Sequence, residues 1–359
     1  MNTQRVFAFI LMVALLFLVG CSKSLGDKKL SKEFLELLSS VTINTIDLDE
    51  IPIQTVYCEP FFRIDNKAKE ERYTLGFPAS FVLVQDSFYI CDRINNVIGV
   101  ADKQGLLTRT IGKKGRGPSE FIMPTQIVAN DSLFLVYDFG NNRVQLFSRQ
   151  ITYLFSVIAN HPPTGPSIFA SKEKIFICKP FGSKKVVEMH ANTEKKASMG
   201  AFLPEAFVID SKTSSSLGNL KLTGDGEGSI FIAYVTLPYL LIFDEEGTLL
   251  RAISFRGKAI DRIMKLNEGN NDVPTRVTFL FNSIRITDNG KIALAVGSSI
   301  FVLSNNTKNV LEKNLALRHI AGGKYDEDYL VPIVDFQISG TILYVADAKS
   351  GSILRASLN

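Results

Sequence analysis

The stretch Asp131-Ser-Leu-Phe-Leu-Val-Tyr-Asp138, followed by the turn Phe139-Gly-Asn-Asn142 and the run Arg143-Val-Gln-Leu-Phe147, shows the pattern on which the whole chain is built. Both runs are rich in β-branched and aromatic residues, which fit a pleated, half-buried sheet. The Gly and Asn residues between them are typical of a tight turn. This stretch therefore predicts two antiparallel strands joined by a turn.

The same pattern occurs six times along the chain. The first β-rich runs are residues 86–92, 131–138, 174–178, 228–234, 290–296 and 340–347, and the second runs are residues 97–101, 144–147, 186–190, 240–243, 300–303 and 353–356. The repeats begin roughly 40 to 60 residues apart, a spacing typical of propeller blades rather than of helical solenoids. The sequence thus predicts an all-β fold, a six-bladed β-propeller of four-stranded blades.

A propeller ring must close, and the last repeat reaches Asn359 after only three strands. Residues 41–47 alternate between apolar and polar and lie outside every repeat. We predict that they supply the missing outer strand, so that an N-terminal strand closes the ring. Residues 31–40 have the pattern of a short amphipathic helix with Ser31 as its N-cap. The expected domains are a signal peptide (1–20), a tether with this helix (21–40) and a propeller (41–359).

The first 20 residues have the composition of a signal peptide. Arg5 precedes an unbroken apolar run over residues 6–19, which is shorter than the about 20 residues that span a bilayer. The run ends in Leu18-Val19-Gly20-Cys21, which resembles the lipobox of bacterial lipoproteins. The resemblance implies that Cys21 carries acyl chains, and two or three chains anchor a protein stably. An ordinary cleaved signal and a membrane-spanning anchor are the alternatives.

The residues after Cys21 bear on where such a lipoprotein would reside. Ser22 stands where, by the sorting rule of bacterial lipoproteins, Asp would hold the protein in the inner membrane. Known surface-export tags resemble an acidic cluster just after the cysteine, and residues 22–26 carry no acid. We therefore expect a lipid anchor in the outer membrane, with the propeller facing the periplasm.

Charge and cysteine content narrow the class of partner. The 359-residue chain has a formal net charge of only +4, which gives no reason to expect nucleic-acid binding. We expect the protein to be a monomer. An exported protein could form disulfides. However, Cys91 and Cys178 lie in matching runs of repeats two blades apart, too far to bond, and Cys58 lies outside the repeats. Small buried apolar residues are the expected role of these cysteines.

The segment between the first two repeats, Ile111-Gly-Lys-Lys-Gly-Arg-Gly-Pro-Ser-Glu-Phe-Ile-Met-Pro124, resembles the G-x-x-G-x-G-P-x-E-F-x-x-P segment of NHL-like propellers. It is especially similar to the six-bladed β-propeller lipoproteins of Bacteroidetes, and the turn over 138–144 resembles the D-x-x-N-x-R-I turn of the same repeats. Repeats three to five depart from this turn pattern. The resemblance implies fold and location but little function, because members of the family mostly have no assigned activity.

This glycine-rich segment has a structural and a functional interpretation. A phosphate-binding loop would lead into a helix, which Pro118 and Pro124 forbid, so a tight turn between blades is favoured. The expected turn residues are Gly112, Gly115, Gly117, Pro118, Glu120, Asp92 and Asp138, with Glu120 accepting backbone N–H groups and Asp92, Asp138 and Asp347 capping the turns that follow them.

Basic side chains in these loops are the candidate ligand-binding residues. Inter-blade loops and the turns between second and third strands share one face of a propeller, so that face is expected to be modestly cationic at its centre and to steer anions. A solvated charged rim is the alternative. The candidates are Lys113, Lys114, Arg116, Arg143 and Lys179.

Two functions remain open from the sequence. We expect a non-catalytic binding or protein-interaction module for an anionic glycan or another envelope component, with no cofactor. The alternative is a metal-dependent lactonase or lyase, and a calcium ion held by acidic side chains stays open. The chain has only His161, His190 and His319, which do not converge in the repeat pattern, so a three-histidine zinc site is not expected.

Overall fold

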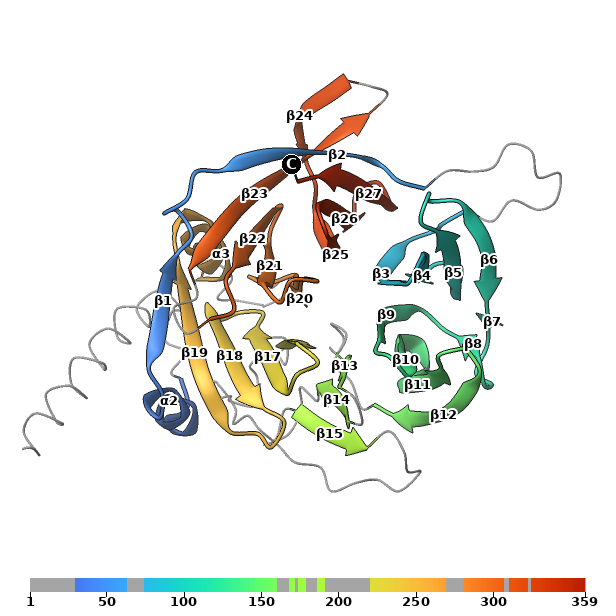
Figure 1. The fold of residues 1–359 in the computed structure, drawn as a ribbon, viewed down its shortest axis with the longest axis horizontal. Helices are drawn as coiled ribbons and strands as arrows, with labels where there is room; N and C mark the ends of the chain where they lie inside the picture. The colour runs from blue at the N-terminus through green and yellow to red at the C-terminus, as the bar shows by residue number, and fades with distance from the viewer. Residues whose placement is uncertain are drawn as a thin grey trace, which may run out of the picture.

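The computed structural model describes residues 30–62, 74–159, 168–171, 174–178, 186–190, 220–268, 280–306, 310–321 and 324–358. Its strands are arranged radially in a ring of six blades (Figure 1). Among the expected site residues, Cys21 and Lys179 lie outside the described residues, as does His161. Within the described residues, no helix combines the length and the apolar character needed to cross a membrane.

Each blade is an antiparallel sheet whose strands follow one another from the centre of the ring outward. Blade 1 comprises β3 (Pro78–Val84), β4 (Ser87–Asp92), β5 (Val97–Asp102) and β6 (Leu107–Ile111); blade 2 comprises β9 (Pro124–Ala129), β10 (Leu133–Asp138), β11 (Arg143–Ser148) and β12 (Tyr153–Ile158); blade 3 has β13 (Ile168–Ala170), β14 (Lys174–Cys178) and β15 (Val186–His190) among its described strands.

The second half of the chain continues the pattern. Blade 4 comprises β16 (Leu220–Gly224), β17 (Ser229–Tyr234), β18 (Tyr239–Asp244) and β19 (Leu249–Arg256); blade 5 comprises β20 (Ser283–Ile286), β21 (Ile292–Val296), β22 (Ser299–Leu303) and β23 (Leu311–Ala321); blade 6 comprises β25 (Ile333–Ser339), β26 (Ile342–Asp347) and β27 (Ser352–Ser357). In every repeat the first predicted run is the second strand of a blade and the second run is its third strand. The six-bladed β-propeller is therefore confirmed.

Smaller elements connect or flank the blades. They are α3 (Lys258–Glu268) between blades 4 and 5, the short pair β7 (Lys113–Lys114) and β8 (Glu120–Phe121), the 3-10 turn η1 (Phe139–Asn141), and β24 (Lys324–Leu330), which pairs with the far end of β23. The β23–β24 hairpin projects beyond the ring at the top of Figure 1.

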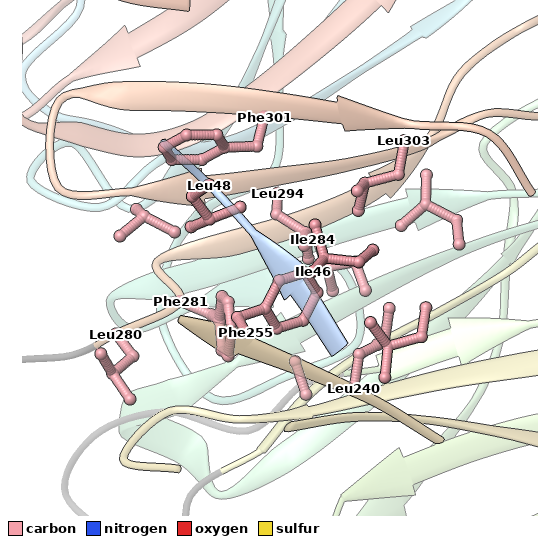
Figure 2. Close-up of a cluster of buried hydrophobic side chains, with 14 of the residues drawn as sticks. Ile46, Leu48, Leu240, Phe255, Leu280, Phe281, Ile284, Leu294, Phe301 and Leu303 are labelled. Atoms are coloured by element: carbon pink, nitrogen blue, oxygen red, sulfur yellow. The ribbon is translucent and has the colours of Figure 1, made fainter. Parts of the chain in front are cut away.

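Apolar side chains fill the spaces between neighbouring blades, because each blade buries both of its faces against the next. One core cluster lies at each of the six blade interfaces. The cluster between blades 4 and 5 contains Leu240, Phe255, Leu294 and Phe301, and Ile46 of the N-terminal segment packs into it (Figure 2). Several large aromatic side chains, among them Phe81, Phe134 and Phe231, are fully buried, so this packing supplies most of the stability of the ring.

The N-terminal segment forms a belt, which we define as residues 43–61, around the outside of three blades. Its first strand, β1 (Ile43–Asp47), adds to the outer edge of blade 4 and runs parallel to β19. Its second strand, β2 (Gln54–Pro60), runs parallel to β23 of blade 5 and then pairs through Glu59 and Pro60 with β27 of blade 6 (Figure 1). An N-terminal strand thus supplies the missing fourth strand of blade 6.

The strand that closes the ring is β2, so the prediction that residues 41–47 close it is wrong. Both segments alternate, but only β2 buries Val56 and Cys58 in the cluster between blades 5 and 6. Phe61, directly after β2, completes the seam between blades 6 and 1. Its ring centroid lies 5.0 Å from that of Phe88 in blade 1 and 5.0 Å from that of Tyr344 in blade 6.

The predicted short helix is α2 (Lys32–Ser39), and the Ser31 hydroxyl caps it by accepting a hydrogen bond from the Phe34 amide at 3.0 Å. This helix is docked rather than free. Phe34 and Leu38 are buried in the cluster between blades 3 and 4, and Phe34 packs edge-on against Tyr234. The helix therefore belongs physically to the propeller rather than to a tether separate from it.

The three described cysteines form no disulfide with one another and are buried in different parts of the ring. Cys91 lies in blade 1, Cys178 in blade 3 and Cys58 in β2. Burial raises the pKa of the Cys58 thiol to about 12. As expected for Cys91 and Cys178, these two cysteines are not joined by a disulfide and are buried, and Cys58 is buried as well.

Candidate functional site

The glycine-rich segment between blades 1 and 2 is fastened to the turn after β10. Asp138 is fully buried and accepts hydrogen bonds from the backbone N–H of Ile122 at 2.7 Å and from the Asn141 side chain at 2.8 Å. Arg143 donates from Nε to Asp138 at 2.9 Å and from Nη2 to the Gly117 carbonyl at 2.7 Å. The conspicuous motif residues thus hold two blades together.

Glu120 and its glycines form the tight part of this segment. The Glu120 carboxylate accepts a hydrogen bond from the Gly117 N–H at 2.8 Å, and this bond, with Lys113 nearby, lowers its pKa below the ordinary value of 4.5. A methyl group on Gly115 would lie 2.1 Å from a Glu120 carboxylate oxygen. Gly112 has a φ of +81°, which suits glycine best. Pro118 lies exposed at the tip.

A second copy of this arrangement joins the entrance of blade 1 to the turn after β4. Asp92 accepts hydrogen bonds from the backbone N–H groups of Gly76 and Phe77 on the incoming segment. It also accepts from the amides of Ile94 and Asn95 in its own turn. The Asp347 carboxylate accepts hydrogen bonds from the backbone N–H groups of Lys349 and Ser350, so it caps the turn that follows it.

The four predicted ligand-binding residues that the structure describes lie around the glycine-rich segment. The Arg143 side chain is only 15% exposed and its donors are used internally. Lys113 is exposed and pairs with Glu120 at 3.4 Å, and Lys114 and Arg116 are exposed. These residues lie on β7 and the adjacent turn at the outer edge of the ring (Figure 1), so they are not the central charges that the sequence suggested.

A different group of polar side chains meets at the axis of the ring, and we call it the axial cluster: Ser80, Lys221, Ser283, Arg285 and Asp335. They come from the inner strands of blades 1, 4, 5 and 6, near the strand ends where the chain enters each blade. The face with these strand ends also carries the glycine-rich segment.

Asp335 is the hub of the axial cluster. Its side chain is 6% exposed and accepts hydrogen bonds from the hydroxyls of Ser80 and Ser283, each at 2.8 Å. Arg285 donates to both carboxylate oxygens of Asp335. Arg285 also donates to the Phe81 carbonyl of blade 1 at 3.4 Å. Because blade 6 lies between blades 5 and 1 in the ring, this contact must form near the axis.

Lys221 completes the axial cluster from blade 4. Asp335, Cys178 and Arg285, on three other blades, are close enough to influence its ionisation, while burial lowers its pKa. The side chain is nevertheless half-buried rather than inaccessible. Lys221 therefore keeps some accessible surface beside the charged groups at the axis.

Sequence reasoning missed the axial cluster, although a signal was present. Lys221 interrupts the apolar inner strand Leu220-Lys-Leu222, and Asp335 interrupts the apolar start of β25. A charged residue inside a buried strand is costly unless it is paired or functional. His319 is buried in β23, the outer strand of blade 5. Within the described residues, no three His, Cys, Asp or Glu side chains gather as metal ligands.

Comparison with known proteins agrees with the observed ring. Residues 69–161 match the DUF5128 family model, described as a 6-bladed beta-propeller. A protein from Bacteroides fragilis NCTC 9343, provisionally described as exported, superposes with a TM-score of 0.50 at 11% identity and covers 84% of this chain and 99% of its own. No curated protein matches the sequence.

Virginiamycin B lyase from Staphylococcus aureus is also similar in fold, with a TM-score of 0.47 and 9% identity, covering 79% of this chain and 95% of its own. At such identity the likeness concerns the fold alone. The matched segment, the six repeats and the closed ring together identify the chain as a six-bladed β-propeller of the kind that this family model describes.

Proposed function

We propose that the protein is an exported, lipid-anchored binding module of the cell envelope, in which the propeller binds a ligand at its axis without transforming it. The observation that carries the proposal is the axial cluster, because a ring stabilised by apolar packing gains nothing from a half-buried lysine at its centre that makes no ion pair with any described residue. The ligand is an anionic glycan or another anionic envelope component, steered to the axis by the excess positive charge.

The belt and α2 support the anchoring part of the proposal. Eight residues lie between Cys21 and Leu30, and Leu30 packs beside the cluster that contains α2. A chain of that length spans at most about 30 Å, so a lipid on Cys21 would hold the rim at blade 4 close to the membrane. We place the anchor in the outer membrane with the propeller facing the periplasm, as a monomer.

Lipidation is tested by replacing Cys21 with Ser in the full-length protein and feeding cells an alkynyl palmitate. We expect the wild-type protein to be labelled and to fractionate with membranes, and Cys21→Ser to lose the label and the membrane association. Cys58→Ser is the matched control and should keep both. An equally labelled Cys21→Ser protein would contradict the proposed anchor.

Binding is tested by screening the full-length protein, in mild detergent, against anionic and neutral glycans and envelope proteins. We expect an anionic ligand to bind and to be recovered unchanged. Metal analysis of protein purified without chelators belongs to the same experiment, and we expect no stoichiometric metal. Turnover of a lactone or ester by a metal-containing sample, without binding of any glycan or protein, would favour the lactonase or lyase alternative.

A further inference from the structure

The direction of Lys221 follows from the alternation of its strand. Its neighbours Leu220 and Leu222 are buried in the cluster between blades 3 and 4, so Lys221 projects from the opposite face of β16. It pairs across the sheet with Ala233, which packs towards blade 5. Arg285 lies on the inner strand of blade 5, and the two cations therefore face the same part of the axis.

The charges of the axial cluster do not balance. Arg285 is committed to Asp335 through two donors, and the Asp335 carboxylate also accepts hydrogen bonds from Ser80, Ser283 and its neighbouring amide. Lys221 makes no hydrogen bond or ion pair with any other residue that the structure describes. Within the part of the chain that the structure describes, two cations and one anion leave one positive charge unneutralised at the axis.

An unneutralised ammonium group in this position favours an anion over water. Loss of hydration destabilises the charged lysine, and one close negative charge would offset that cost. A second negative charge would be repelled by Asp335, whose carboxylate lies in the same cluster. The charge balance thus selects a group that carries a single negative charge.

We propose that the axial cluster holds one monoanionic group of the ligand, a carboxylate or a phosphodiester, and that Lys221 donates directly to it. This inference rests on the proposed binding function and names the chemistry of its site. Arg285 and Asp335 act as positioning residues, because their bidentate pair fixes the wall opposite Lys221.

The test titrates full-length protein in mild detergent with four probes by calorimetry. Glucuronate and dimethyl phosphate carry the single negative charge on a carboxylate and a phosphodiester, inorganic phosphate is mostly doubly charged at pH 8, and glucose is neutral. We expect one of the two monoanions to bind, the other to be weaker, and phosphate and glucose to be weaker than both.

Lys221→Met is expected to weaken binding of the preferred monoanion about tenfold or more, since a hydrogen bond to a charged group contributes about 1.5–3 kcal/mol. Lys221→Gln is a second variant, and thermal unfolding shows that each remains folded. The matched control is Lys113→Met with Lys114→Met, which removes two exposed charges at the rim and should leave the affinity unchanged.

A pH series adds a readout that a purely structural lysine would not give. Because burial lowers the pKa of Lys221 from its ordinary value of 10.5, despite the opposing influence of Asp335 and Cys178, wild-type affinity should fall as pH rises, with its midpoint below 10.5. Lys221→Met should show no such fall.

Equal affinity in wild type and folded Lys221→Met, or loss of affinity in the rim variant, would overturn the axial site. If envelope glycans still bind to Lys221→Met as to wild type, the proposed binding function stands and this inference fails. If neither the probes nor any glycan or envelope protein binds wild type, both fail.

Discussion

Asp138 shows how much of the conspicuous motif serves the fold. Its buried carboxylate accepts hydrogen bonds from Ile122, Asn141, Arg143 and the side chain of Gln145. In the sequence, a charged residue at a turn that follows a glycine-rich segment resembles part of a ligand site. In the structure its carboxylate oxygens are occupied by the inter-blade segment and by side chains of blade 2, so little is left for a ligand.

Replacing Asp138 with Asn should therefore destabilise the protein by about 3 kcal/mol, because it leaves the largely buried Arg143 without its anion. Asp244→Asn is the matched control. One oxygen of Asp244 accepts from the amides of Glu246 and Thr248 in a turn, and an amide oxygen can replace it at a cost below about 1 kcal/mol. Urea unfolding followed by circular dichroism suits a chain without Trp. Equal losses in the two variants would contradict this role.

At the scale of elements, the belt joins the two ends of the chain. Strand β2 lies on blades 5 and 6, and Phe61 then fills the seam with blade 1, where its amide donates to the Ile353 carbonyl at 2.9 Å. A propeller without closure would expose the faces of its first and last blades. The same segment that would lead to the anchor thus holds the ring shut.

Phe61→Ala should cost about 3–5 kcal/mol, because it leaves a cavity between the first and last blades. Ile53→Ala, just before β2, is the control: Ile53 is 67% exposed, and its loss should change stability by less than about 0.5 kcal/mol. Urea midpoints measure both. A Phe61→Ala protein as stable as Ile53→Ala would show that Phe61 does not close the seam.

At the scale of the whole molecule, local sequence patterns predicted the blades. The closing strand and the axial cluster depend on long-range contacts, which such patterns do not show. Each strand pair, such as residues 86–101, has its own β-rich runs and turn residues, so the six repeats can be recognised in the sequence. The closing strand cannot be recognised in this way, because residues 43–47 and 54–60 both alternate and their parallel partners lie more than 200 residues away. The axial cluster could not be predicted from the sequence for the same reason, since Ser80 and Asp335 come into contact only when the ring closes.

The proposed function requires a ligand that binds at the axis rather than at the rim. A crystal structure of the protein with its preferred monoanion, glucuronate or dimethyl phosphate, tests this most directly. The account predicts that the anionic oxygens lie within hydrogen-bond distance, about 2.7–3.2 Å, of Lys221 Nζ. A monoanion bound to Lys113, Lys114 or Arg116, with none beside Lys221, would contradict it.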